Sequence, residues 1–198
     1  MAVRDLIVRN RSRRRFDQGV AVGMDVLEEL VDLARHSASA RNLQPLKYIL
    51  SNDPDVNEKI FKTLAWAVDL PDWPGPAPGE RPAAYIIILG DTGLAESFDH
   101  DCGIAAQSMM LGAVEKGFGG CMLGSIQRKE LRQALDIPEG FKILLVLALG
   151  KPNEKVVVEE ARNTSDIKNI RYRRDEKGVH HVPKRPLSEL IAARFTVR

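Results

Sequence analysis

The sequence contains few cysteines, and nothing pairs them. Only two of its 198 residues are cysteines, Cys102 and Cys121, and they form neither a CxxC motif nor a spacing typical of paired metal ligands. This pattern excludes a disulfide-stapled domain and a cysteine-rich zinc site as the organising principle of the fold. We expect both thiols to be reduced and mostly buried, which is typical of a cytoplasmic protein.

Long apolar runs and a large excess of one charge are also missing. No stretch approaches the roughly 18 apolar residues of a membrane-spanning helix, and no signal-peptide pattern is apparent. The chain has 29 basic and 27 acidic residues, so its overall charge favours neither nucleic acid nor an anionic membrane as a partner. Its hydrophobic content of 44% predicts one domain, residues 1–198, around a single buried core.

Positive charge is nevertheless concentrated in one N-terminal segment, which contains Arg9, Arg11, Arg13, Arg14 and Arg15. Three interpretations remain open: a solvated charge run, an arm that binds nucleic acid, or an anion site. A phosphate site needs guanidinium groups and a hydroxyl that converge on one small anion. Arg11, Ser12 and Arg14 could supply these groups, with Phe16 as an anchor, whereas a DNA-binding arm would be expected with more basic surface elsewhere.

The apolar pattern predicts alternating helices and strands. Helices are expected over residues 3–9, 25–38, 57–67, 104–114 and 127–135. Strands are expected over residues 47–51, 84–90 and 141–150, with a further apolar piece over 119–123. Asp25 and Glu28 are typical of a capping box at the start of the second helix. The strands 84–90 and 141–150 are apolar throughout, so we expect both faces to be covered, in an α+β fold of three layers around one sheet.

The stretch from Asp101 to Gly124 is unusual because no residue from Ile104 to Val114 is charged. A helix without a charged face is predicted to be buried. Gly117, Gly119 and Gly120 follow it, and they allow two interpretations. They could simply end a core helix, or the small residues could let another helix or a flat ligand approach the backbone closely.

Two connecting segments carry possible binding groups. Residues 37–45 form a polar connector in which Asn42 and Gln44 offer the donors and acceptors that the edge of a heterocycle needs. Five prolines between Pro71 and Pro82 preclude a regular element. Trp66 and Trp73 flank that region, either as packing anchors or as the aromatic walls of a lid.

The C-terminal part is predicted to contain a hairpin over residues 172–182 that turns at residues 176–178. Lys184 and Arg185 follow, either as surface charge or as further members of the anion site. His180 and His181 do not predict a metal site, because neighbouring residues on a strand point to opposite faces. The triplet of residues 99–101 (Asp-His-Asp) also contains ligand types, but neither it nor the histidine pair has a further ligand at a spacing familiar from metal sites, so no metal is expected.

Five of these segments, taken in order along the chain, resemble the FMN-dependent nitroreductase family. They are the RSxRxF segment at Arg11–Phe16, the segment Ala38–Pro45 that ends in NxQP, the uncharged helix and glycine turn at Ile104–Gly120, the ALGxP segment at Ala148–Pro152, and the basic pair Lys184–Arg185. Two positions depart from the family pattern. Asn10 stands where the family usually has an arginine, and Leu46 replaces an aromatic residue.

The resemblance implies an interlocked homodimer, with a mixed or antiparallel sheet flanked by helices and two FMN sites at the interface. It implies that the phosphate is held by basic and hydroxyl groups: Arg11, Ser12, Arg14, Lys184 and Arg185. It also implies that one loop approaches the flavin from the other subunit, through Ser39, Asn42, Gln44 and Pro45. The backbone N–H groups of Gly119 and Gly120 would lie beside the reactive edge of the isoalloxazine.

The function implied by the resemblance is an FMN-dependent oxidoreductase. It would pass hydride from NADH or NADPH to a nitroaromatic, a quinone or a similar small acceptor in a ping-pong mechanism, without a nucleic-acid or membrane partner. Because the cofactor carries the chemistry, no catalytic side chain is predicted. Two alternatives remain: a non-reductase protein that stores, breaks down or senses FMN, and a nucleic-acid-binding module that uses the Arg9–Arg15 cluster.

Overall fold

Two long apolar strands form the centre of an antiparallel sheet in the computed structural model, which describes residues 2–197. The sheet has the order β1-β5-β3-β2, and β4 also pairs with β5. The strands are β1 (Phe16–Asp17), β2 (Leu46–Ser51), β3 (Ala84–Asp91), β4 (Gly119–Leu123) and β5 (Phe141–Pro152). The predicted strands are confirmed, with β5 two residues longer than expected.

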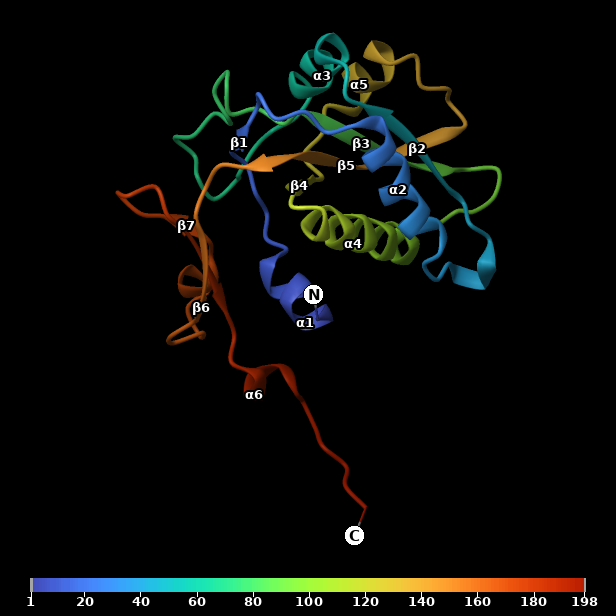
Figure 1. Cartoon of the computed structure of the whole chain (residues 1–198). Helices are drawn as coiled ribbons and strands as arrows, with labels where there is room; N and C mark the ends of the chain where they lie inside the picture. The colour runs from blue at the N-terminus through green and yellow to red at the C-terminus, as the bar shows by residue number, and fades with distance from the viewer. Residues whose placement is uncertain (1, 198) are drawn as a thin grey trace. The chain divides into compact units, whose positions relative to one another are not determined.

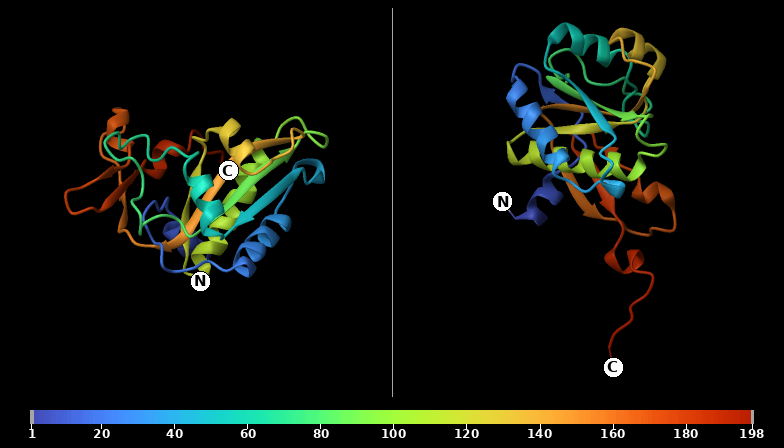
Figure 2. Two further views of the ribbon diagram at one scale, coloured as in Figure 1. Left: turned by 90° about the horizontal axis from the view of Figure 1, so that it is seen from above. Right: turned by 90° about the vertical axis from the view of Figure 1, so that its right-hand side faces the viewer.

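Helices cover both faces of this sheet (Figures 1 and 2). One face carries α2 (Met24–Arg35) and α4 (Asp99–Glu115), and the other carries α3 (Pro54–Phe61) and α5 (Arg128–Ala134). The short helix α1 (Val3–Arg9) packs against α4. The predicted α+β fold in three layers is therefore confirmed.

The alternation of side chains along β3 explains why this strand is apolar throughout. Ile86 and Ile88 pack into the core beneath α2 and α4. Ile87 and Leu89 pack into the core beneath α3 and α5. Successive residues of a strand point to opposite faces, so a strand between two helical layers needs apolar residues at every position.

The chain divides into two compact units. The N-terminal unit comprises the residues up to Trp66 together with Trp73–Asn153, and the C-terminal unit comprises Ala67–Asp72 and the residues from Glu154 onward. The expectation that the whole chain forms one domain stays a prediction. None of the helices described in residues 2–197 is long and apolar enough to cross a membrane.

The C-terminal unit contains a small mixed sheet of three strands. Strand β8 (His180–Lys184) pairs in parallel with β6 (Val156–Glu160) and antiparallel with β7 (Arg173–Arg174). The unit also contains a 3-10 helix, η2 (Ile167–Ile170), and a short helix, α6 (Leu187–Leu190). The predicted hairpin turn is confirmed, because the amide of Gly178 donates to the carbonyl of Asp175 at 2.9 Å.

The predicted boundaries of α2, α3 and α4 are wrong, and α4 begins at Asp99, five residues before the predicted start at residue 104. Helix α2 begins after Gly23, which forms no side-chain cap, so Asp25 and Glu28 do not make the expected capping box. It ends at Arg35 instead of Ala38, because the Ser37 hydroxyl donates to the carbonyl of Leu33 at 2.9 Å and closes the last turn.

Helix α3 covers residues 54–61, not residues 57–67 as predicted. The side chain of Asp53 accepts a hydrogen bond from the amide of Val56, and Pro54 occupies the first turn. Both features are typical helix starts, so the sequence contained the signal for this boundary. After Phe61 the chain leaves the helix, and Leu64 forms an isolated bridge with Ile126.

Helix α4 ends as the glycine pattern predicts. Gly117 has a φ of +80°, and its amide donates to the carbonyl of Val114. The small residue Gly112 serves a different purpose, because a Cβ there would lie 2.3 Å from Cδ1 of Leu33. Glycine thus lets α2 and α4 approach closely, as one of the two interpretations of this stretch proposed. Ile104 is 39% exposed, so burial of α4 on every side stays a prediction that requires a partner.

The two tryptophans act as packing anchors for the proline-rich segment. Trp66 is 8% exposed, and its ring centroid lies 5.8 Å from that of Phe61. A Cβ at Gly75, in the proline-rich segment, would lie only 2.8 Å from the Trp66 ring. Trp73 packs against the same core as Trp66, on the side of α3 and α5.

Candidate functional site

The N-terminal basic segment lies along the start of β4. Ser12 forms a parallel bridge with Gly120, and the amide of Arg13 donates to the carbonyl of Gly120 at 2.8 Å. Phe16 is fully buried in β1 and anchors the segment to β5 through its pairing with Pro152. The fold therefore brings together two predicted site residues, Ser12 and Gly120, that are more than a hundred positions apart in sequence.

The arginines of this segment have different environments. Arg15 forms a two-pronged ion pair with Glu80, with Nε 2.8 Å from a carboxylate oxygen. Arg14 is only 8% exposed, and the stem of Arg13 lies against Gly119. Arg14 and Arg15 are therefore not part of a solvated charge run, whereas Arg9 is exposed.

Arg11 has the environment expected of an anion-binding residue. Its Nη2 atom donates to the carbonyl of Ile7 at 2.7 Å, but its buried Nε atom has no acceptor among the residues that the structure describes. Burial lowers the pKa of Arg11. A bound anion would supply both the missing acceptor and the compensating charge, so this residue fits the predicted phosphate contact.

Asn10, which departs from the family pattern, has a structural partner. Its side-chain amide donates to Oε1 of Gln107 at 3.3 Å and so links the end of α1 to α4. The residue that replaces the usual arginine is thus used to fix the position of α1.

Gly119 and Gly120 are buried, and protein atoms fill the space beside both. A Cβ at Gly119 would lie 2.8 Å from Cγ of Pro152, and one at Gly120 would lie 2.2 Å from the carbonyl oxygen of Ala148. The close approach of β4 to its neighbours therefore already requires glycine at both positions. Their proximity to a flavin stays a prediction.

The loop between α2 and β2 has an unusual backbone. It contains a 3-10 turn, η1 (Ala40–Asn42), and three residues with positive φ: Arg41 at 54°, Asn42 at 56° and Gln44 at 50°. A residue other than glycine in this region costs about 1–3 kcal/mol, and such strain often occurs at functional sites. The exposed side-chain amide of Gln44 donates to the carbonyl and the side-chain oxygen of Asn42, at 3.2 and 3.3 Å. Pro45 is buried and leads into β2.

Asp101 fixes this loop, and its role was not predicted from the sequence. Its two oxygens accept hydrogen bonds from the Ser39 hydroxyl at 2.5 Å and from the amide of Ala40 at 2.9 Å. The Ser39 oxygen in turn accepts from the amide of Gln44 at 2.9 Å. Ser39 is therefore occupied within the loop, and its contact with a flavin stays a prediction. The available signal was an acidic residue just before a helical run that carries no charge from Ile104 to Val114.

A cavity of about 190 Å³ lies beside this loop, within the N-terminal unit. Its walls include Ser39, Gln44, Tyr48 and Asp101. Burial, assisted by Cys102 and Asp101, raises the pKa of Tyr48 to about 12. The phenol of Tyr48 therefore keeps its proton near neutral pH and can act as a hydrogen-bond donor in this cavity.

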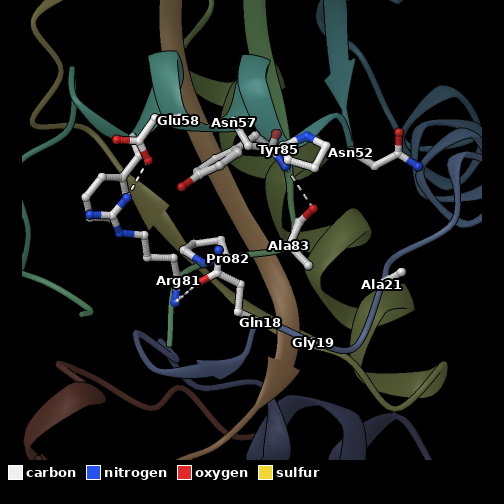
Figure 3. A pocket seen from close by; sticks show the side chains of 12 residues that line it. Gln18, Gly19, Ala21, Asn52, Asn57, Glu58, Arg81, Pro82, Ala83 and Tyr85 are labelled. Atoms are coloured by element: carbon white, nitrogen blue, oxygen red, sulfur yellow. Dashed lines mark hydrogen bonds and ion pairs between the residues drawn. The ribbon is translucent and has the colours of Figure 1, made fainter. Parts of the chain in front are cut away.

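A second cavity, of about 170 Å³, lies between α3 and the start of β3 (Figure 3). Glu58 forms an ion pair with Arg81, whose guanidinium lies 4.1 Å from the ring centroid of Phe61. Asn57 donates to the carbonyl of Ala83 at 2.9 Å (Figure 3). None of the predicted site residues lines this cavity, and these contacts join elements of the fold.

Lys184 and Arg185 lie in the C-terminal unit. Lys184 ends β8 and pairs with Glu160, and its carbonyl accepts a hydrogen bond from Ala161. Arg185 donates to Glu189 at 3.0 Å and to the carbonyl of Thr164 at 3.3 Å. Their contribution to a phosphate site stays a prediction.

The histidines of β8 lie on opposite faces, as expected. His180 is 1% exposed, whereas His181 contacts Glu159 through Nδ1 and Asp175 through Nε2, both at 3.1 Å. The two carboxylates approach opposite edges of the ring, so they do not converge on one point. Within residues 2–197, no three metal-ligating side chains are arranged so that they could hold an ion.

The N-terminal unit is thus a three-layer α+β fold in which a basic segment lies along the start of the strand that contains Gly119 and Gly120. A sequence profile of the nitroreductase family matches residues 7–151, so the chain belongs to this family. The predicted family and its class, an oxidoreductase enzyme, are thereby confirmed.

Individual relatives are distant but cover most of the chain. A protein of Archaeoglobus fulgidus, provisionally named as an NADH dehydrogenase or NAD(P)H nitroreductase, is 27% identical over 143 residues, which cover 68% of this chain and 77% of that protein. A nitroreductase family protein from Clostridium difficile 630 superposes with a TM-score of 0.68 at 19% identity, over 99% of this chain and all of the other.

An FMN-dependent nitroreductase from Clostridium difficile R20291 has a TM-score of 0.61 at 19% identity and covers 86% of this chain and 98% of its own. At these identities the solved structures show a shared fold. The predicted nitroreductase-like fold is therefore confirmed.

Proposed function

We propose that this protein is an FMN-dependent oxidoreductase that acts as a homodimer. When bound, FMN would supply hydride and electron transfer from NADH or NADPH to a nitroaromatic, a quinone or a similar small acceptor, in ping-pong order. The protein's part is to bind the cofactor, orient it and shape the space for the acceptor.

The observation that carries this proposal is the half-buried Arg11 side chain, whose Nε atom is fully buried. Its Nε lacks an acceptor among the described residues, and the neighbouring Ser12 lies against the start of β4. A buried donor without an acceptor is unfavourable, and a bound anion would supply that acceptor. We assign Arg11 and Ser12 to the phosphate of FMN, with Arg14, Lys184 and Arg185 as further predicted partners.

The homodimer is supported by exposed apolar side chains on α1 and α4. Val3 and Ile7 on α1 are 68% and 45% exposed, and Ile104, in the uncharged part of α4, is 39% exposed. A second copy that covered these residues would remove apolar surface from water, which is the main driving force of association. In that dimer the loop with Ser39, Asn42, Gln44 and Pro45 would approach the flavin of the partner subunit.

The remaining parts of the proposal concern the glycine strand and the two cysteines. The backbone at Gly119 and Gly120 would lie near the flavin, and no side chain is required as an obligate acid or base. Cys102 and Cys121 are not joined in a disulfide within the described residues, which suits the proposed cytoplasmic location.

Purified protein tests the proposal directly. We expect FMN to bind in titration, its visible absorbance to bleach anaerobically with NADH or NADPH, and the absorbance to return when a nitroaromatic or quinone is added. A preparation that gains no flavin would overturn the proposal. Bound FMN that neither nicotinamide bleaches would leave the alternative of a non-reductase FMN-binding protein.

The nucleic-acid alternative receives no support from the arginine cluster. Arg14 is buried, and Arg15 is neutralised by Glu80. An arm that binds phosphates along a duplex needs exposed, unneutralised cations.

A further inference from the structure

The loop that carries Asn42 and Gln44 is closed at both ends by a single buried carboxylate. Asp101 accepts the Ser39 hydroxyl and the Ala40 amide, at 2.5 and 2.9 Å. Ser39 connects Asp101 to the other end of the loop, because its oxygen accepts a hydrogen bond from the amide of Gln44 at 2.9 Å. The left-handed residues of the loop therefore lie between two points that are fixed to the same side chain.

Asp101 is itself held firmly. It is 6% exposed and lies in the first turn of α4, where the helix N-terminus favours a negative charge. Helix α4 packs on the sheet through its buried residues Ala105, Met109 and Ala113. The loop is thus tied to a helix that packs into the core of the N-terminal unit.

We infer that Asp101 is a positioning residue, which acts through Ser39 to hold the amides of Asn42 and Gln44 in the orientation that flavin binding requires. The inference rests on the proposed function, in which this loop approaches the flavin. Because Gln44 already donates to Asn42, the two side chains follow the backbone as one group.

The site requires a carboxylate and not merely a polar residue. Both groups that reach Asp101 are donors, an O–H and an N–H, so both of its oxygens must accept. In Asp101→Asn the NH₂ group that replaces one oxygen cannot accept the Ser39 hydroxyl, so Ser39 loses its bond to a charged acceptor and can only accept, from the new amide and from Gln44. The left-handed residues then lose the charge-assisted contact that offsets their strain.

Limited proteolysis tests the restraint without any cofactor. Arg41 is exposed within the loop, and trypsin cleaves after arginine. We expect Asp101→Asn to speed cleavage of the Arg41–Asn42 bond by about tenfold or more, because hydrogen bonds to a charged group are lost. Cleavage after Lys142, in the central strand β5, reports global unfolding and should remain slow. Equal acceleration at both bonds, or no acceleration at Arg41, overturns the inference.

FMN titration then tests the link to the flavin. We expect Asp101→Asn and Ser39→Ala each to weaken FMN binding by about tenfold, and the double variant to be little worse than either, because both remove the same restraint. Ser39→Thr should restore binding, since it keeps the hydroxyl and the extended backbone at Ser39 suits a β-branched residue.

Ser51→Ala is the matched control. It also removes a buried hydroxyl that bonds to a side chain, in this case Asn57, but it lies at the far end of β2 from the loop. We expect its FMN affinity to equal that of the wild type. If Ser51→Ala weakens FMN binding as much as Asp101→Asn does, Asp101 is merely structural. The same conclusion follows if the losses of FMN affinity in Asp101→Asn and Ser39→Ala are fully additive in the double variant. A wild type that binds no FMN refutes the proposed function instead, while the proteolysis result still stands.

Discussion

The amide nitrogen of Arg13 lies 2.8 Å from the carbonyl oxygen of Gly120, and this bond joins the N-terminal segment to β4. Gly120 also lies close to β5, and this approach depends on glycine, because a Cβ at position 120 would lie 2.2 Å from the carbonyl oxygen of Ala148. Gly120→Ala should therefore lower the free energy of unfolding by about 2–3 kcal/mol or more, as overpacking against backbone does. Urea denaturation measures this.

Gly140→Ala is the control for that substitution. A Cβ at Gly140 would meet no atom within 4 Å, so we expect a change within about 0.5 kcal/mol. Equal stability of the two variants would mean that β4 lies farther from β5 than the structure shows.

The phosphate assignment predicts the effect of removing Arg11. Arg11→Ala deletes a charge-assisted contact worth about 1.5–3 kcal/mol, so FMN affinity should fall by roughly one to two orders of magnitude. Fluorescence titration of FMN with the apoprotein measures this. Arg15→Ala serves as the control, because it removes the same charge from the same segment but breaks the pair with Glu80. Unchanged affinity in Arg11→Ala would place the phosphate elsewhere.

The elements with strong local signals could be predicted from the sequence. Strands β3 and β5 are continuous apolar runs, and the glycine after α4 marks the end of that helix. Helix α3 was misplaced because its start depends on Asp53 and Pro54, which are polar or ring-constrained and contribute nothing to an apolar stripe.

The contacts that assemble the site could not be predicted in the same way. The role of Arg15 depends on Glu80, and that of Ser39 depends on Asp101, in each case more than sixty positions away. A motif identifies which side chains are available, but the fold decides which of them are already paired. Asp101 and Tyr48 were missed because neither belongs to a motif and both matter through long-range contacts.

The contacts of His181 predict a pH-dependent hairpin in the C-terminal unit. Hydrogen bonds to Asp175 and then to Glu159 raise the pKa of His181, so its contribution is complete below about pH 6.5 and is lost as the pH rises through the raised value. Bonds from Arg173 and His181 lower the pKa of Glu159, and bonds from His181 and the Val179 amide lower that of Asp175. Their contribution is complete above about pH 4.5 and is lost as the pH falls through the lowered values.

The hairpin should therefore be most stable between about pH 4.5 and 6.5. Hydrogen exchange of residues 173–184, compared between the wild type and His181→Gln, measures this. The two proteins should differ most within that window and converge at higher pH. His100→Gln, which changes an exposed histidine on α4, should behave like the wild type throughout. A difference that grows above pH 7 would contradict the prediction.

Asn57 joins three elements at the second cavity, and its removal should be costly. Its oxygen accepts from the Ser51 hydroxyl at 2.7 Å, and its nitrogen donates to the carbonyl of Ala83 at 2.9 Å. Asn57 is 8% and Ser51 is 4% exposed, so Asn57→Ala removes a hydrogen bond from the buried Ser51 hydroxyl and from the half-buried carbonyl of Ala83. Each unsatisfied group costs about 1–3 kcal/mol, and we expect a total loss of about 2–4 kcal/mol in the free energy of unfolding, since the Ser51 hydroxyl can rotate toward another acceptor.

Asn52→Ala provides the comparison for Asn57→Ala in urea denaturation. Asn52 donates a single bond, to the carbonyl of Val22 at 3.1 Å, and is itself exposed, so water can replace it. We expect Asn52→Ala to lower the free energy of unfolding by less than about 1 kcal/mol. The double variant Ser51→Ala with Asn57→Ala should lower the free energy of unfolding by less than the sum of the two separate losses, because the two residues share one hydrogen bond. Full additivity, or a loss below that of Asn52→Ala, would show that Asn57 does not connect α3 to β2 and to the start of β3.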